Sequence, residues 1–140
     1  MDKTKCAKLI AAVKERGYSA GGDRVLVNRS EFFNGNDDPG SIGCNLLKHP
    51  GVDAFDAVFR KIEAMDGVAG VYLAITEIDE TSDNIWPFSD TALIVTRLSP
   101  TAFESVLRPL EPDEAAISHE AFANPPAIPQ GHQFVYVWWD

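Results

Sequence analysis

The sequence lacks several features that mark whole classes of protein. No apolar run approaches the roughly 18 residues that a membrane-spanning helix needs, and the first apolar stretch is broken by Lys8 and Lys14. That stretch is also too short and too charged for a signal peptide. The two cysteines, Cys6 and Cys44, have no metal-type spacing and are too few for a disulfide framework. We therefore expect a cytoplasmic protein with free thiols.

The short motifs of common enzyme classes are absent as well. The sequence contains no P-loop, no Gly-x-Ser-x-Gly, no His-Glu-x-x-His and no dinucleotide fingerprint. A pairing of Cys44 with His49 would lack the third, orienting group that an activated nucleophile needs. Zinc would need more ligands than one cysteine and scattered histidines supply. We expect no cofactor and no bound metal, and the sequence favours a protein that is not an enzyme.

Basic residues are scarce in the second half of the chain. Residues 1–61 hold ten of the twelve Lys and Arg residues and eight acids, whereas residues 62–140 hold thirteen acids against Arg97 and Arg108. The formal net charge of −9 therefore comes from residues 62–140. Such a field repels phosphate backbones, so we expect no nucleic-acid partner, and it favours a basic protein or a cation as partner. Solubility alone is the alternative explanation for this charge.

The composition is that of an ordinary globular domain. Of the 140 residues, 45% are hydrophobic and 24% are charged, and neither a repeat nor a low-complexity linker divides the chain. This length is typical of one domain and suffices to bury a core without disulfides. The sequence thus predicts a single globular domain over residues 1–140.

Hydrophobic periodicity predicts where the helices and strands lie. In the first helix, Cys6, Leu9, Ile10 and Val13 have the spacing of one buried face. Strands are indicated by short β-branched runs, and turns by Gly and Pro. We expect three helices: one over 3–16, one that Pro50 opens and Gly67 ends, and one over 100–110. We expect strands over 24–28, 68–78, 91–96 and 133–139. Residues 111–131 are expected to form a loop with one helical turn near 114–122.

Without its first helix, this order of elements reads βαββαβ. It is the order of the ferredoxin-like fold, so we predict an α+β domain with a four-stranded, mainly antiparallel sheet and helices on one face. Alternation along the last strand directs one of Trp138 and Trp139 inward and the other outward. An uncovered outer indole would add to an exposed aromatic patch of the kind found at interfaces.

One long polar loop, residues 31–45, has the composition of a binding loop. Its glycines allow closely spaced amides that could cradle an anion, and its oxygen-bearing side chains could bind a hard cation. The spacing does not match the calcium loop pattern. Alternatively, the Asn and Asp side chains satisfy the backbone of a structural turn. The candidate ligand or metal residues are Asn36, Asp37, Asp38, Ser41 and Asn45.

A second loop, residues 77–90, combines acids with large aromatic residues. Residues 77–90 hold five acids and no base, and they include the sequence Trp-Pro-Phe at 86–88. Aromatic anchors supply contact energy and charges steer the encounter, which suits a surface that docks a basic partner. Alternatively, the aromatics fold back onto the core while the acids face water. The candidate partner-binding residues are Asp79, Glu80, Asp83, Trp86 and Phe88.

Three hypotheses for function follow from these two loops. The first is a non-enzymatic protein-binding module that engages a basic partner, as immunity proteins neutralise basic toxins. The second is an enzyme or a metal- or small-ligand-binding domain built around residues 36–45, with Asp37 and Asp38 as acid–base or metal groups. The third is a homodimer formed through a sheet edge or the strand that carries Trp138 and Trp139.

Overall fold

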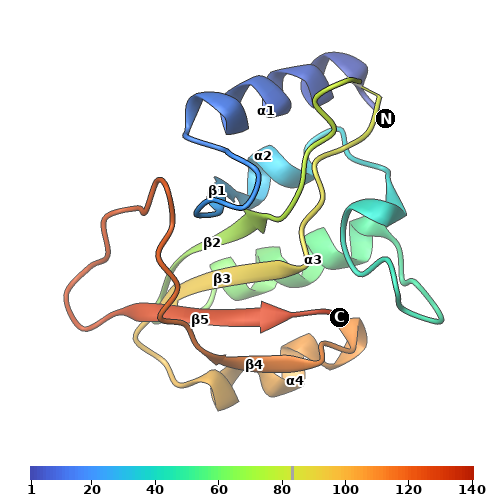
Figure 1. Ribbon diagram of the computed structural model, residues 1–140. Helices are drawn as coiled ribbons and strands as arrows, with labels where there is room; N and C mark the ends of the chain where they lie inside the picture. Colours follow the sequence, from blue (N-terminus) through green and yellow to red (C-terminus); the bar gives the residue numbers. More distant parts are fainter. Residues whose placement is uncertain (83) are drawn as a thin grey trace.

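An open antiparallel sheet forms the centre of the molecule in the computed structural model (Figure 1). The structure describes residues 1–82 and 84–140. Within these ranges the sheet has five strands, in the spatial order β1-β2-β3-β5-β4. The strands are β1 (Val25–Asn28), β2 (Val68–Ile75), β3 (Thr91–Thr96), β4 (Glu114–Ile117) and β5 (Gln133–Trp138).

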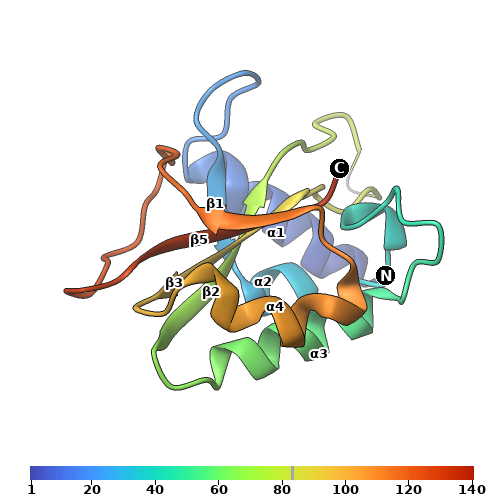
Figure 2. The ribbon, with the colours of Figure 1, turned by 90° about the horizontal axis from the view of Figure 1, so that it is seen from below.

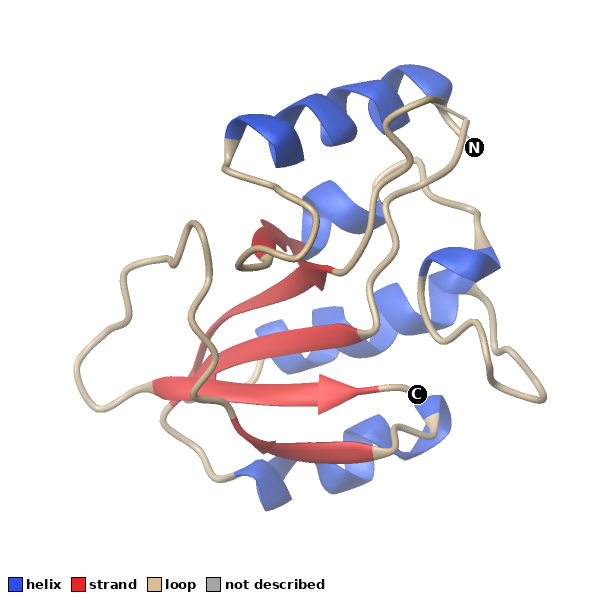
Figure 3. Cartoon of the chain, viewed as in Figure 1, coloured by secondary structure: helices blue, strands red, loops and turns tan. Residues whose placement is uncertain are grey.

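The helices pack around this sheet and confirm the predicted α+β class (Figure 3). Figure 2 shows α2, α3 and α4 together on one face, and in Figure 1 α1 lies beyond the β1 edge. Among the described residues, none of the helices combines the length and apolar character needed to cross a membrane. The helices are α1 (Lys3–Glu15), α2 (Arg29–Phe33), α3 (Val52–Glu63) and α4 (Glu104–Leu107), with the 3-10 helices η1 (Pro39–Ser41), η2 (Pro100–Phe103) and η3 (Arg108–Leu110).

The strand order differs from the predicted ferredoxin-like arrangement. In a split βαβ arrangement another strand separates the first two strands, but here β1 pairs directly with β2 and β2 with β3, each antiparallel. The sheet also has one strand more than the four predicted. Periodicity places strands along the chain but carries no signal for which strands become neighbours, and this explains the difference.

The fifth strand, β4, lies where we expected a loop with a helical turn. Glu114 pairs with Trp138 and Ile117 with Val135, so the edge of β5 imposes the extended conformation. The predicted helix over 100–110 is divided into η2, α4 and η3. Pro109 contributes to this break because it has no backbone N–H for a helical hydrogen bond.

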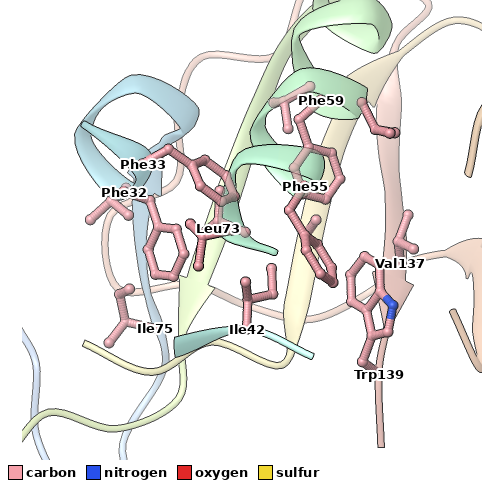
Figure 4. Close-up of a cluster of buried hydrophobic side chains, with 14 of the residues drawn as sticks. Phe32, Phe33, Ile42, Phe55, Phe59, Leu73, Ile75, Val137 and Trp139 are labelled. Carbon is pink, nitrogen blue, oxygen red and sulfur yellow. The ribbon is translucent and has the colours of Figure 1, made fainter. Parts of the chain in front are cut away.

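The main core lies between the helices and one face of the sheet. Phe55 and Phe59 of α3 meet the indole of Trp139 at ring-centroid distances of 5.3 and 6.2 Å (Figure 4). Trp139 is only 2% exposed, and its Nε1 donates to the Leu110 carbonyl over 2.8 Å. Trp138, its neighbour, is half-buried on the opposite face. The predicted inward and outward orientations of the two indoles are confirmed.

The other face of the sheet is covered by the connection between β4 and β5, residues 118–132, which we call the strap. Phe122 of the strap packs edge-to-face on Phe134, with ring centroids 5.4 Å apart. Beyond it, the Asn124 side chain accepts from the Leu26 amide over 2.8 Å and donates to the Leu26 carbonyl over 2.9 Å. The strap thus crosses from the β4 edge to the β1 edge and satisfies backbone groups that β1 would otherwise expose.

A salt bridge between α1 and α2 makes the stability depend on pH. Burial acts to raise the pKa of Glu31, but two hydrogen bonds from Arg16, at 3.0 and 2.6 Å, and one from the Asn28 amide outweigh it. The pKa of Glu31 therefore lies below its ordinary value of 4.5. A carboxylate with a lowered folded-state pKa stabilises the fold above the unfolded-state pKa, and this contribution is lost as the pH falls through the folded-state value.

We expect Glu31→Gln to lower the free energy of unfolding by about 1 kcal/mol at neutral pH, because the pair is partly exposed. Urea titrations of both proteins at a series of pH values should show this difference shrinking as the pH falls below 4.5. Glu104→Gln, at an exposed position of α4, is the matched control. A difference between wild type and Glu31→Gln that does not change with pH would contradict the assignment.

Candidate functional site

The loop predicted to bind a ligand forms a turn that satisfies its own polar groups. The buried Asn36 side chain donates to Ser41 Oγ and accepts from the Asp38 amide, both over 2.9 Å. Asp38 Oδ1 accepts from the Gly40 amide over 2.8 Å at the start of η1. Ser41 Oγ in turn donates to the Asp38 carbonyl over 2.7 Å. These contacts support the structural-turn interpretation, and the ligand role of the loop stays a prediction.

The other two predicted ligand residues have different surroundings. The side chain of Asp37 is 72% exposed and accepts from the Met1 amino group over 2.8 Å. Asn45 is exposed and lines a hollow of about 170 Å³ beside Cys44 and Asp90. Over residues 1–82 and 84–140, no three or more His, Cys, Asp or Glu side chains are grouped in a way that could hold a metal ion.

The two long loops meet at Ser41 and Asn45, two of the predicted ligand residues, but not at Asp37 or Asp38. The Ser89 amide donates to the Ser41 carbonyl over 2.9 Å, which joins the end of one loop to the end of the other. Asn45 and Asp90 then line the same small hollow. The Asp37 carboxylate pairs with the amino terminus instead, and the Asp38 carboxylate accepts from the Gly40 amide at the start of η1.

Trp86 lies in the core and not on the surface. Its side chain is 1% exposed, and its Nε1 has no hydrogen-bond partner among the described residues. Phe88 is half-buried, and its amide and carbonyl pair with Glu77. Asp83, a third predicted contact, lies outside the described residues. The burial of Trp86 agrees with the alternative interpretation, in which the aromatic residues fold back onto the core. This indole therefore cannot serve as a surface anchor for a partner.

Asp79 and Glu80, the remaining predicted contacts, lie against α1. They line a hollow of about 460 Å³ together with Lys14. Asp79 Oδ1 accepts from the hydroxyl and the amide of Thr81, at 2.6 and 2.9 Å, and these hydrogen bonds lower the pKa of Asp79. One carboxylate of this loop is thus engaged in a local turn. The role of Asp79 and Glu80 in binding a partner stays a prediction.

A denser group of carboxylates lies beside β4, where the sequence analysis proposed no site. A groove of about 610 Å³ runs along α4, η3 and the start of β4. Arg108 is the one basic residue that lines it in the described structure. The acidic residues that line it, which we call the acidic groove, are Glu104, Glu111, Asp113 and Glu114.

The turn from η3 into β4 brings three of these acids together. Glu111 has a left-handed backbone with a φ of 49°, the only positive φ among the non-glycine residues described. Its amide donates to the Arg108 carbonyl over 3.1 Å, and Pro112 follows, so the helix cannot continue. The Asp113 amide then donates to the Trp138 carbonyl over 2.8 Å and begins the pairing with β5. The carboxylates of the turn after η3 and of the start of β4 therefore share one groove.

β4 presents an open edge next to the acidic groove. It is the last strand in the order β1-β2-β3-β5-β4, so one of its sides has no strand neighbour among the described residues (Figure 1). Ile117, at its end, is 46% exposed. An edge strand carries unpaired N–H and C=O groups on which another chain can add a strand.

Little in the sequence indicates that residues 114–117 form an edge strand. Glu and Ala are depleted in strands, so residues 114–117, Glu-Ala-Ala-Ile, do not have a strand composition. The charge count did place the excess of acids in residues 62–140, but not in a particular part of them. A count restricted to 104–114 would have found Glu104, Glu111, Asp113 and Glu114 opposed by Arg108 alone.

Comparison with known proteins places the chain in a family. The model of the Uncharacterized protein YfbO family matches residues 4–137. The chain belongs to the YfbO family. The "Uncharacterized protein YfbO" of Escherichia coli (strain K12) is 32% identical over 120 residues, which is 84% of this chain and 84% of that protein. No solved structure matches the chain.

The YfbO match covers both of the long loops, the acidic groove and the strap, because all of them lie within residues 4–137. The alignment with the E. coli relative covers 84% of each of the two chains, so the similarity is not confined to one motif. Neither the family description nor the name of the relative states an activity.

Proposed function

We propose that this YfbO family member is a binding module for a basic protein, and that it binds an extended segment of that protein along β4. The observation that supports this function is the open edge of β4 beside the acidic groove. In strand addition, main-chain hydrogen bonds contribute affinity while side-chain pockets contribute specificity. A small acidic inhibitor, such as the immunity proteins that neutralise basic toxins, is the kind of molecule that we propose.

Charge selects the partner. Four carboxylates against the guanidinium of Arg108 leave the groove strongly negative. A basic segment is attracted to such a surface, and the attraction acts mainly on the rate of association. Salt weakens it because exposed charges are screened beyond about 10 Å at 0.1 M ionic strength.

The same charge disfavours a homodimer through this edge. Two copies joined at β4 would bring two acidic grooves, each with an excess of carboxylates, to one interface. Surfaces of like charge repel each other, and this repulsion opposes such an association. Short length and charge also protect an edge from aggregation, which is the simplest competing explanation for the composition of β4.

A short peptide that alternates lysine and valine is a direct probe of the proposed function. We expect the triple variant Glu111→Lys, Asp113→Lys, Glu114→Lys to lower its association rate by about tenfold or more at low salt, because the charges steer the encounter. Surface plasmon resonance at about 50 and about 300 mM NaCl measures this rate and its salt dependence.

Two controls separate charge from strand addition. The variant Glu15→Lys, Asp23→Lys, Asp66→Lys has the same change in net charge on exposed residues outside the groove, and it should bind as the wild type does. A peptide of the same sequence with alternate amides methylated keeps its charges but cannot pair along one edge, so it should bind more weakly. Equal binding of both triple variants, or no binding by the wild type, would overturn the proposal.

A further inference from the structure

A second hollow, on the opposite face of the sheet from the main core, has a different chemistry. Its volume is about 320 Å³, and it lies between the start of the strap and the outward side of β5. It shares no lining residue with the acidic groove. We call it the strap pocket; its lining includes Arg24, Asp90, His119, Glu120, Tyr136 and Trp138.

The charged groups of the strap pocket largely compensate one another. Arg24 donates to both oxygens of Glu120, at 2.8 and 2.7 Å, and to Asp90 Oδ1 over 2.9 Å. Hydrogen bonding to Glu120 outweighs the effect of burial and raises the pKa of Arg24. A cationic ligand would approach the Arg24 guanidinium, and an anionic one would approach two carboxylates. The pocket therefore favours a ligand without net charge.

Polar groups of both kinds remain for such a ligand. The hydrogen bonds that the Asp90 carboxylate accepts from described residues all go to Oδ1, from Arg24, Thr76 and Thr91, so Oδ2 is available as an acceptor. The His119 imidazole can donate or accept, and the Tyr136 hydroxyl, which donates to the Glu114 carboxylate, can still accept. A ligand that carries several hydroxyl groups matches this mixture, because a hydroxyl both donates and accepts.

Two aromatic residues complete the pocket. Tyr136 and Trp138 are two positions apart on β5, so they stand on the same side of the sheet, and both are half-buried. The face of an aromatic ring carries partial negative charge and attracts C–H groups of a ligand that packs on it. A saccharide ring offers such a C–H face together with hydroxyl groups at its rim.

We infer that the strap pocket binds one neutral saccharide unit. Sites for small molecules span about 300 to 1,000 Å³, and a volume of about 320 Å³ therefore suits a single ring. The unit is either a free monosaccharide or the terminal residue of a glycan, which present the same ring to the pocket. The inference does not rest on the proposed function, because the strap pocket and the acidic groove share no lining residue. Ile117, at the end of β4, lines the strap pocket and not the groove.

Titration of the full chain with methyl glucoside, methyl galactoside, methyl mannoside and N-acetylglucosamine tests the inference. Of the three tryptophans, Trp86 and Trp139 are buried, so a saturable change in fluorescence would report on Trp138. We expect at least one sugar to bind with a dissociation constant on the order of 1 mM. Trp138→Ala should weaken binding by about tenfold or more, and Leu47→Ala, at a fully exposed site, should not change it.

Charged analogues test the argument from charge. Glucosamine and glucuronate carry a cation and an anion, and each should bind more weakly than its neutral counterpart, N-acetylglucosamine or methyl glucoside. Immobilised glycans that end in the bound sugar distinguish the two sources, because a pocket that accepts only free sugar will not retain them. The inference is overturned if no sugar gives saturable binding, if a charged analogue binds more tightly, or if nuclear magnetic resonance shows that Trp138→Ala binds as the wild type does.

Discussion

Replacing Trp139 with alanine is expected to lower the free energy of unfolding by about 4 kcal/mol, the typical cost of removing a large buried aromatic side chain. The indole is 2% exposed and lies against Phe55 and Phe59, so its loss leaves a cavity in the centre of the core (Figure 4). It also removes the donor to the Leu110 carbonyl, which holds η3 against the end of β5. Urea unfolding followed by circular dichroism measures the change.

Two neighbouring substitutions separate the contributions to this effect. Trp139→Phe keeps an aromatic ring but leaves the Leu110 carbonyl without its donor, so we expect a loss of about 1 to 2 kcal/mol. Trp138→Ala should cost less than Trp139→Ala because the Trp138 side chain is half-buried. A larger loss for Trp138→Ala would mean that the two indoles have exchanged inward and outward positions.

Arg24→Met is the second substitution with a large expected effect, a loss of about 2 to 3 kcal/mol. The Arg24 side chain is 24% exposed and binds Asp90, next to β3, as well as Glu120 of the strap. Without it, two partly buried carboxylates face each other with no cation between them. The cost is below that of a fully buried pair because water reaches the site.

Hydrogen exchange shows where this stability is lost. The Ala123 amide, which donates to the Arg24 carbonyl over 3.0 Å, should exchange faster in Arg24→Met as the strap detaches. Arg97→Met is the matched control, because Arg97 pairs with the exposed Asp66 at 3.4 Å and should contribute less than about 0.5 kcal/mol. If Arg24→Met and Arg97→Met cost the same, the strap is not held by this cluster.

Local patterns predicted most of the elements but not their arrangement. The 3.6-residue spacing of Cys6, Leu9, Ile10 and Val13 predicted α1 and its buried face, and all four are buried. The apolar runs predicted β3 and β5 within one residue of their observed ends. These predictions succeed because helix and strand impose their own period on the side chains that face a core. No such period predicts the path of the strap or the position of the acidic groove.

The candidate sites show the same division. The sequence predicted an acidic second half, and the acidic groove lies within it, but the emphasis on Trp86 rested on composition alone. Trp86 is in the core because an aromatic residue in a polar loop can fold back as readily as it can stay exposed. Neither Asp79 nor Glu80 lines the groove beside β4.

By itself, the sequence determined the α+β class, the positions of α1 and α3 and the excess of acids after residue 61. Tertiary structure alone decided that residues 114–117 form a strand, because Glu-Ala-Ala-Ile becomes extended only when it can pair with β5. It also decided which charges lie together. Arg24 meets Asp90 and Glu120 across 66 and 96 residues of chain, and no local rule anticipates contacts at such separations.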